Sequence, residues 1–164
     1  MINYFELLKN IPPQVATMII AMLPIAENRV SVPIALSVYH LPLWQALFFS
    51  ILGSILAAAI IVYGLNLIYS RLRGKMGIAD KLMQKIFDRT ERKFAKKYEK
   101  WGELALLIFV AVPLPLTGVW TGSLASFLFG IKPGRALLFI GLGVILSAGI
   151  VALASLGVIN IFNF

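Results

Sequence analysis

Two long runs of apolar residues dominate the pattern along the chain. One extends over about Leu43–Ser70 and the other over about Ala136–Ile159, and neither contains a charged residue. About 20 apolar residues in a helix are enough to cross the hydrocarbon core of a bilayer. Both runs therefore predict transmembrane helices.

Two further apolar stretches are interrupted. Residues 11–41 contain prolines and two charges, so the uninterrupted pieces, about 12–25 and 30–40, are each too short to cross a membrane. Residues 104–131 repeat this form, with the sequence PLPLTG in the middle. Because proline breaks the hydrogen-bond ladder of a helix, each stretch predicts helix, break, helix: either a kinked span or a re-entrant hairpin. Both breaks should face the protein interior, where their freed polar groups can find partners.

The composition agrees with a membrane protein. Hydrophobic residues make up 60% of the 164 residues, charged residues make up 13%, and the mean hydropathy is +0.90. A water-soluble domain of this length needs more polar surface. We therefore expect a single integral membrane domain over 1–164, multi-pass in the plasma membrane. The lack of cysteine excludes disulfides and thiol catalysis.

Most of the charge lies in one segment, 71–103. Eleven of the 15 lysines and arginines and five of the seven acids fall there. Apolar residues recur in this segment at steps of three and four, which is typical of an amphipathic helix. Because basic segments beside membrane spans favour the cytoplasmic side, we expect a helix on the cytoplasmic membrane surface rather than a nucleic-acid-binding region. The alternative is an ordinary solvated connector.

The two halves of the chain resemble each other. When the chain is shifted by 91 residues, the Leu-Pro pair at 23–24 falls on that at 114–115, and Pro42 falls on Pro133. Each half also has the same order of elements: a broken hairpin, a proline-marked loop and a long span. The sequence therefore predicts an internal repeat.

The predicted membrane topology follows from this repeat. If both broken stretches are re-entrant, each half crosses the membrane once and the halves have opposite orientations, as in many secondary transporters. We predict an all-α membrane protein with two inverted repeats, each a re-entrant helical hairpin plus one transmembrane helix, joined by a cytoplasmic amphipathic helix. Repeat one would cover 11–70, the connector 71–103 and repeat two 104–164. Lys132 and Arg135 would then lie inside, as the positive-inside rule favours, whereas four ordinary spans would place them outside.

A glutamate and an arginine, Glu27 and Arg29, stand alone in the first interrupted stretch. No other charged residue lies between Lys9 and Arg71. A charge at the bilayer centre costs about 2.5–3.5 kcal/mol on insertion scales, so this pair needs a reason. One is a self-neutralising salt bridge that seals the hairpin tip. The other is an ion or substrate site near the midplane, where Glu27 would carry protons and Arg29 would hold a phosphate or carboxylate.

The break in the second stretch offers partners for these charges. Prolines and glycines set its backbone, while threonines and a tryptophan supply hydroxyls and an aromatic face. If the halves pack tip to tip, this break would meet Glu27 and Arg29. Its site candidates are Pro113, Pro115, Thr117, Gly118, Trp120, Thr121 and Gly122.

Both breaks resemble signatures of a known family. MLPIAENRVSVPIAL, residues 22–36, is similar to a P-x-x-E-x-R-x-x-x-P signature, and FVAVPLPLTGVWTGSLAS, residues 109–126, to a P-x-P-x-T-G-x-W-x-G run. Over nearly its whole length the chain resembles the small multidrug export proteins, and more distantly the DedA-like (VTT) membrane proteins. The resemblance implies two facing re-entrant hairpins and either export of small drugs or movement of lipid carriers or phospholipids. It also adds Pro33 to the site candidates.

The expected function is membrane transport without catalysis. The sequence has no metal-ligand spacing, P-loop or nucleophile elbow, and no cofactor is expected. We expect ion- or proton-coupled secondary export of a small amphipathic compound. The alternatives are flippase- or scramblase-like translocation of a lipid or polyprenyl phosphate, and a non-transporting scaffold. Because two full spans hardly enclose a path, we expect a homodimer, with the bilayer and a small-molecule, ion or lipid-phosphate substrate as its other partners.

Overall fold

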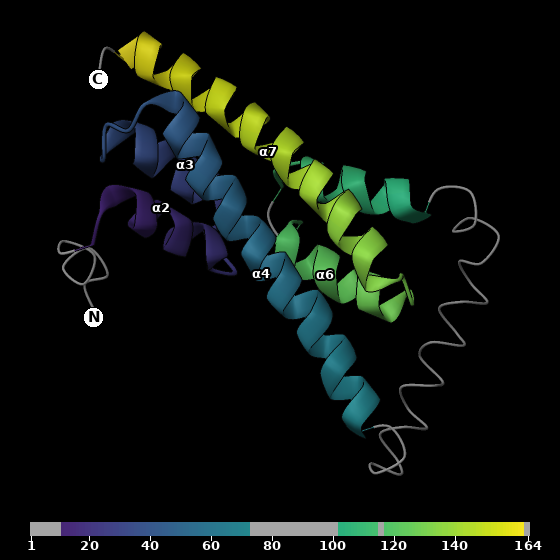
Figure 1. Ribbon diagram of the computed structural model, residues 1–164. Coiled ribbons are helices and arrows are strands. Elements are labelled where there is room, and N and C mark those ends of the chain that lie inside the picture. The colour runs from purple at the N-terminus through teal and green to yellow at the C-terminus, as the bar shows by residue number, and fades with distance from the viewer. Residues whose placement is uncertain (1–10, 73–101, 115–116, 163–164) are drawn as a thin grey trace.

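The structure is a computed structural model that describes residues 11–72, 102–114 and 117–162, and within these ranges all regular structure is helical. Figure 1 shows the arrangement of the helices. Their bounds are α2 Pro13–Met22, α3 Glu27–Ser37, α4 Leu43–Leu72, a helix at Gly102–Ala111, α6 Val119–Leu128 and α7 Pro133–Phe162. The amphipathic helix predicted for 71–103 lies almost entirely outside the described residues.

The two long helices, α4 and α7, lie side by side and run in opposite directions (Figure 1). Each has 30 residues, or roughly 45 Å at 1.5 Å per residue. Their apolar parts, Leu43–Arg71 and Pro133–Val158, are long and apolar enough to cross a membrane, with hydropathies of 2.4 and 2.6. Both predicted long helices are therefore confirmed, and each extends a few residues beyond its predicted bounds.

Small side chains allow close packing where these helices meet. Ala57, Ala58 and Ala136 are almost fully buried, and they belong to one core cluster with Ile140 and Val144. The outer surfaces of both helices carry exposed leucines and isoleucines. Small residues inside and large apolar residues outside are the arrangement expected of helices that pack within lipid.

The first interrupted stretch folds into a helical hairpin of α2 and α3, separated by the break 23–26. Pro13 stands at the first position of α2, where its missing N–H costs nothing. Gln14, at the start of α2, donates a hydrogen bond of 3.2 Å to Gln45 near the start of α4. Since α3 ends at Ser37, only a short loop before α4, both ends of the hairpin lie at the same end of α4.

The second interrupted stretch folds in the same way, from the Gly102–Ala111 helix through the break 112–118 to α6. Glu103 forms an ion pair of 3.2 Å with Arg135, so the hairpin begins beside the first turns of α7. A turn at Gly130 ends the hairpin and leads directly into α7. Both ends of the second hairpin therefore lie at the start of α7.

Glycines in the long helices let each hairpin approach closely. A Cβ atom added to Gly53 in α4 would collide with the backbone carbonyl of Met18 in α2. A Cβ atom added to Gly143 in α7 would lie 2.8 Å from the carbonyl oxygen of Leu107 and 2.8 Å from the Cβ of Val110. Each hairpin is thus seated against a long helix where no side chain intervenes.

The structure corrects one expected boundary. The sequence places Glu27 and Arg29 in a break before a helix at about residue 30, but α3 begins at Glu27. The amide of Glu27 donates to Leu23 at 3.1 Å and that of Val30 donates to Ala26 at 3.1 Å. The chain therefore turns helical earlier, and the two charges lie in the first turn of a helix.

Candidate functional site

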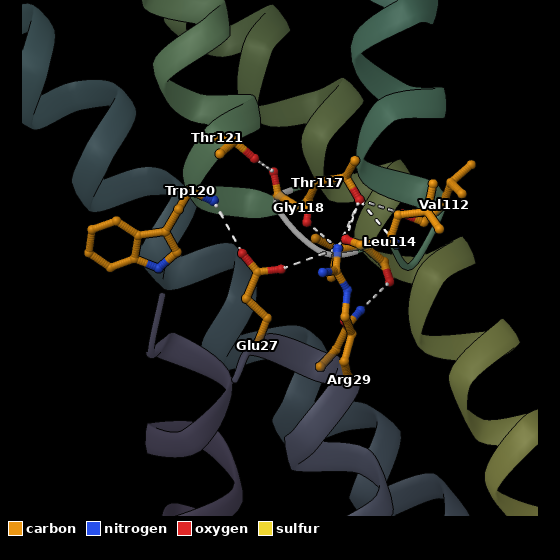
Figure 2. A network of polar contacts seen from close by, with 10 residues as sticks. Glu27, Arg29, Val112, Leu114, Thr117, Gly118, Trp120 and Thr121 are labelled. Carbon is orange, nitrogen blue, oxygen red and sulfur yellow. Dashed lines mark hydrogen bonds and ion pairs between the residues drawn. The ribbon is translucent and has the colours of Figure 1, made fainter. Parts of the chain in front are cut away.

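The breaks of the two hairpins meet, and the charged residues lie where they touch (Figure 2). Five residues form this contact, which we call the tip junction: Glu27, Arg29, Thr117, Gly118 and Trp120. The first two come from the first turn of α3, and the other three from the second break and the start of α6. The contact between the second break and the two charges, which the sequence suggested only on the condition that the halves pack tip to tip, is made by these residues.

Glu27 places its carboxylate at the N-terminus of α6. The residue is only 5% exposed, and its Oε1 accepts a hydrogen bond of 3.4 Å from the backbone amide of Trp120. The first amides of a helix lack partners within the helix and carry a partial positive charge. Glu27 therefore stabilises α6 from the opposite hairpin, and α6 in turn stabilises the buried carboxylate.

Arg29 reaches across to the same break from the other side. One of its guanidinium nitrogens, Nη2, donates to the carbonyl oxygen of Thr117 and lies 3.0 Å from the hydroxyl of that residue. The side chain is 20% exposed. Because Pro and Gly leave the second break without helical hydrogen bonds, its carbonyls need such donors. Arg29 supplies one of them.

The direct ion pair between the two charges is loose. Nη2 of Arg29 lies 4.0 Å from Oε2 of Glu27, at the outer limit for a salt bridge. The hydrogen bonds of both side chains go mainly to the opposite hairpin. The pair is therefore not a self-contained salt bridge at one tip, and its main contacts join the two tips.

One donor of Arg29 has no partner. The Nε atom is buried and makes no hydrogen bond within the described residues. A buried donor without a partner costs about 1–3 kcal/mol. An incoming acceptor, such as an oxygen of a phosphate or carboxylate group, would remove that cost.

Thr117 holds the second break in shape. Its hydroxyl lies 2.8 Å from the carbonyl oxygen of Val112 and 2.7 Å from that of Leu114, and it accepts the amide of Leu114 at 3.2 Å. Threonine side chains commonly satisfy turn backbone in this way. The same residue therefore orders its own turn and receives Arg29.

Trp120 ties the junction to α2. Its indole Nε1 donates a hydrogen bond of 3.1 Å to the carbonyl oxygen of Met22, the last residue of α2. The last carbonyls of a helix have no intrahelical donor. Trp120 therefore links the two hairpins through a hydrogen bond. The sequence had suggested a different role, in which its ring supplies an aromatic face.

Two backbone conformations at the junction are unusual. Glu27 has a φ of 46° and Gly118 a φ of 144° with a ψ of −161°. A positive φ is uncommon for a residue other than glycine, and the conformation of Gly118 is accessible essentially to glycine alone. Such strain persists where the surroundings enforce it, which is common at functional sites.

A family described as "Putative small multi-drug export protein" matches residues 27–150, about three quarters of the 164-residue chain. The chain belongs to this family. No curated protein and no solved structure matches this chain significantly.

The small multidrug export family match begins at Glu27 and includes the whole tip junction. The family description indicates a transport role, and the two long apolar helices agree with a membrane protein.

Other candidate residues of this family member lie around the junction. Thr121 bonds within the first turn of α6, from its hydroxyl to the carbonyl of Gly118 at 3.4 Å. Gly122 is buried where a Cβ would lie 2.7 Å from Cγ2 of Val110, so it serves the packing of α6 on the preceding helix. Pro113 is partly buried in the break. Pro115 lies outside the described residues.

Pro33 lies within α3, one turn beyond Arg29, and its carbonyl oxygen accepts a hydrogen bond from Ser37 of the same helix. It acts through the backbone, since it offers no N–H to the carbonyl of Arg29. Asn28, which is not among the candidates selected from the sequence, donates to the carbonyl oxygen of Val144 in α7 at 3.4 Å and is 3% exposed. The position of Asn28, a polar amide between two charged residues in an apolar stretch, is the sequence signal that could have selected it.

Proposed function

We propose that this protein is a secondary transporter that exports a small amphipathic compound in exchange for, or together with, an ion or proton. The observation that carries the proposal is the tip junction, where a buried carboxylate and an arginine join two helix breaks. Charged groups at membrane depth mark ion or substrate pathways, and broken helices form the binding sites of many transporters. The proposed role involves no catalysis and no nucleic acid.

We further infer that both hairpins are re-entrant in the plasma membrane. The helices α2 and α3 have 10 and 11 residues, or roughly 15 Å each, which is half of the ~30 Å hydrocarbon core. Each hairpin also begins and ends at one end of a long helix. This geometry supports a chain with two full crossings and two hairpins that enter from opposite sides.

Matched features in the two halves support inverted repeats. The contact of Gln14 with Gln45 corresponds to the contact of Glu103 with Arg135. Glu103 lies 89 residues after Gln14, and Arg135 lies 90 residues after Gln45. Each contact joins the start of a hairpin to the start of a long helix. The repeat would relate the two hairpins by an axis in the membrane plane, as in other inverted-repeat transporters.

The backbone supports the same relation. Glu27 and Gly118, which both have positive φ, are 91 residues apart, and His40 and Gly130, with φ of 50° and 66°, are 90 apart. The shift of 91 read from the sequence therefore fits the hairpin tips, whereas the loops before the long helices, at His40 and Gly130, follow a shift of 90.

In the proposed repeat, this change of shift bears on one pairing of prolines. The carbonyl oxygen of Pro42 accepts the amide of Ala46 at 3.1 Å, and that of Lys132 accepts the amide of Ala136 at 2.9 Å. By position Pro42 thus corresponds to Lys132, and its coincidence with Pro133 is one residue out of register. The loop before α4 has one residue more than the loop before α7.

The proposed transport cycle makes and breaks the tip junction. The bonds from Arg29 to Thr117 and from Trp120 to Glu27 and Met22 close the contact between the hairpins. A rocking movement of one repeat against the other would open these bonds on one side and admit substrate. Substrate or ion would favour the open state by binding Glu27 or Arg29 better there than in the closed state.

The test is export by purified protein in proteoliposomes and by whole cells loaded with a fluorescent amphipathic cation. We expect Glu27→Gln and Arg29→Gln each to reduce export at least tenfold, because each removes a charge that the junction needs. Arg135→Gln, which breaks an exposed ion pair, is the matched control and should keep export. If both junction variants fold and export normally, the proposal is wrong. If they only lower thermal stability, and the native protein exports nothing, a scaffold role is the better answer.

A second candidate is translocation of a lipid or polyprenyl phosphate, and the unpartnered Nε of Arg29 favours it. A guanidinium group binds phosphate with two parallel hydrogen bonds, which lysine cannot reproduce. Loss of activity in Arg29→Lys would therefore support a phosphate substrate. Export that survives Arg29→Lys but not Glu27→Gln would support the amphipathic compound. In either case we propose a homodimer, because two full spans in one chain hardly enclose a path.

A further inference from the structure

A second group of buried polar residues lies where α3, α4 and α7 meet. The five residues are Asn28, Ser31, Ser50, Ser54 and Ser147, with exposures of 3% or less. We call them the hydroxyl cluster. Polar side chains at the contact of membrane helices need partners, since no bulk water is available there.

Contacts on either side of the cluster place its members at a similar height along the helix axes. Asn28 bonds to Val144 at one side, and Val32 packs with Leu47 and Val151 at the other. Ser31 lies between Asn28 and Val32 on α3. Its hydroxyl bonds to that of Ser50 in α4 at 2.9 Å.

The remaining two serines follow from helix geometry. Ser54 comes one turn after Ser50 on α4, and Ser147 lies between Val144 and Val151 on α7. Residues three or four apart share a face of a helix. Ser54 and Ser147 therefore belong to the faces that meet α3.

Two hydroxyls of the cluster have no partner. The Oγ atoms of Ser54 and Ser147 are buried and unbonded among the described residues. Serines near the surface behave differently: Ser37 and Ser155 each donate to the carbonyl four residues earlier in their own helix, at 2.7 Å. Ser54 and Ser147 forgo that local bond. Buried hydroxyls that are free of their own helix are available to a ligand.

We propose that the hydroxyl cluster binds a sodium ion, which is the coupling ion of the transport proposed above. Its ligands are neutral oxygens from several helices, the type of group that holds Na⁺ in broken-helix transporters. Glu27, next to Asn28, supplies a nearby negative charge. Arg29 is the only lysine or arginine from position 28 to 70, and its guanidinium group is bonded to Thr117.

Pro33 adds to the oxygen-rich character of this region. It withholds the amide that would otherwise bond the carbonyl of Arg29, one turn before it in α3. Pro33 thereby removes one intrahelical donor from a backbone oxygen of the residue next to Asn28. The sequence had placed Pro33 among the candidate residues without such a role.

The test is thermal unfolding of the full chain in nanodiscs, in NaCl, KCl or choline chloride at equal ionic strength. We expect a rise in melting temperature that is specific to Na⁺ and saturates with its concentration. Ser54→Ala and Ser147→Ala should each raise the half-saturating Na⁺ concentration at least tenfold. The matched control is Ser123→Ala: its hydroxyl is also buried and unpartnered, but it lies on α6 outside the cluster.

For each variant, the result is the difference between its melting temperatures in NaCl and in KCl. A general loss of stability lowers both temperatures and does not affect this difference. The proposal is overturned if the native protein shows no Na⁺-specific rise, as for a cluster that holds only water, or if Ser123→Ala weakens Na⁺ binding equally. The outcome is separate from the transport assay. Na⁺ binding without export would refute the transport proposal alone, whereas export that needs no Na⁺ would refute the coupling role.

Discussion

At the scale of single residues, Gly118 decides whether the tip junction can form. Its φ of 144° suits glycine alone, and an added Cβ would collide with the carboxylate of Glu27, 2.7 Å from Cδ. The carboxylate can cap α6 only because no side chain stands between them. A glycine is therefore required here by conformation and by space at once.

We predict that Gly118→Ala destabilises the protein by about 2–4 kcal/mol and abolishes export, because it adds strain and displaces Glu27. The matched control is Gly130→Ala, which has a φ of 66° but open space around the position. It should cost only about 1–2 kcal/mol and preserve export. Thermal unfolding in detergent and the export assay measure both. Equal effects of the two variants would show that the contact with Glu27 is unimportant.

The hydrogen bond from Trp120 to Met22 gives a second prediction at this scale. Trp120→Phe keeps an aromatic ring but removes the donor to Met22, so it should lower stability by about 1 kcal/mol. Trp44→Phe is the control, since Trp44 is 65% exposed at the start of α4. It should change the melting temperature little. A larger loss for Trp44→Phe would contradict the role given to Trp120.

At the scale of elements, the hairpins depend on the glycine positions of the long helices. Because Gly53 has no side chain, α2 can pack closely against α4. Gly143 allows the Gly102–Ala111 helix to pack against α7 in the same way. Close approach of this kind increases van der Waals contact, which is a main source of helix association in lipid. The position of each tip, and hence of the junction, follows from how deeply its hairpin is seated.

We predict that Gly53→Ala and Gly143→Ala each cost about 1–3 kcal/mol, because their Cβ atoms would push against backbone that cannot move aside. Gly64→Ala in α4 and Gly149→Ala in α7 are matched controls with open space around them. These should be neutral or more stable, since alanine is the better helix former by about 1 kcal/mol. Thermal unfolding of the four variants compares them directly. Four similar results would contradict close seating of the hairpins.

At the scale of the whole molecule, the two hairpins enter from opposite ends of an antiparallel pair of long helices. The ends of one hairpin lie by the start of α4, and those of the other by the start of α7. Because α4 and α7 run in opposite directions (Figure 1), the end of α4 and the start of α7 lie toward the same end of the pair. Arg71 belongs to the last turn of α4 and Arg135 to the first turn of α7, and both are exposed. In the proposed topology, the positive-inside rule would place that end in the cytoplasm.

Cysteine labelling in whole cells tests this orientation, since the chain has no cysteine of its own. Single cysteines at His40 and Lys132, both exposed, are treated with a membrane-impermeant thiol reagent. We expect His40→Cys to react and Lys132→Cys to react only after the cells are opened. Reaction of both in intact cells would indicate four ordinary spans and would refute the re-entrant hairpins.

Much of the fold could be predicted because its signals are local. Length and apolarity identify α4 and α7, and Pro24 and Pro113 mark the breaks where helices cannot continue. The start of α3 could not be predicted, because the helix begins at Glu27 through a strained residue. That conformation is held by contacts with the other hairpin.

The sequence by itself determined the long helices, the two breaks and the isolation of one charged pair in an apolar region. These depend on composition and spacing, which act within a few residues of the chain. The tertiary structure alone decided which groups meet. Arg29 bonds Thr117 across 88 residues, Glu27 bonds Trp120 across 93, and Trp120 bonds Met22 across 98. Such pairs arise only when the long helices seat both hairpins, because no local pattern records a partner so far along the chain.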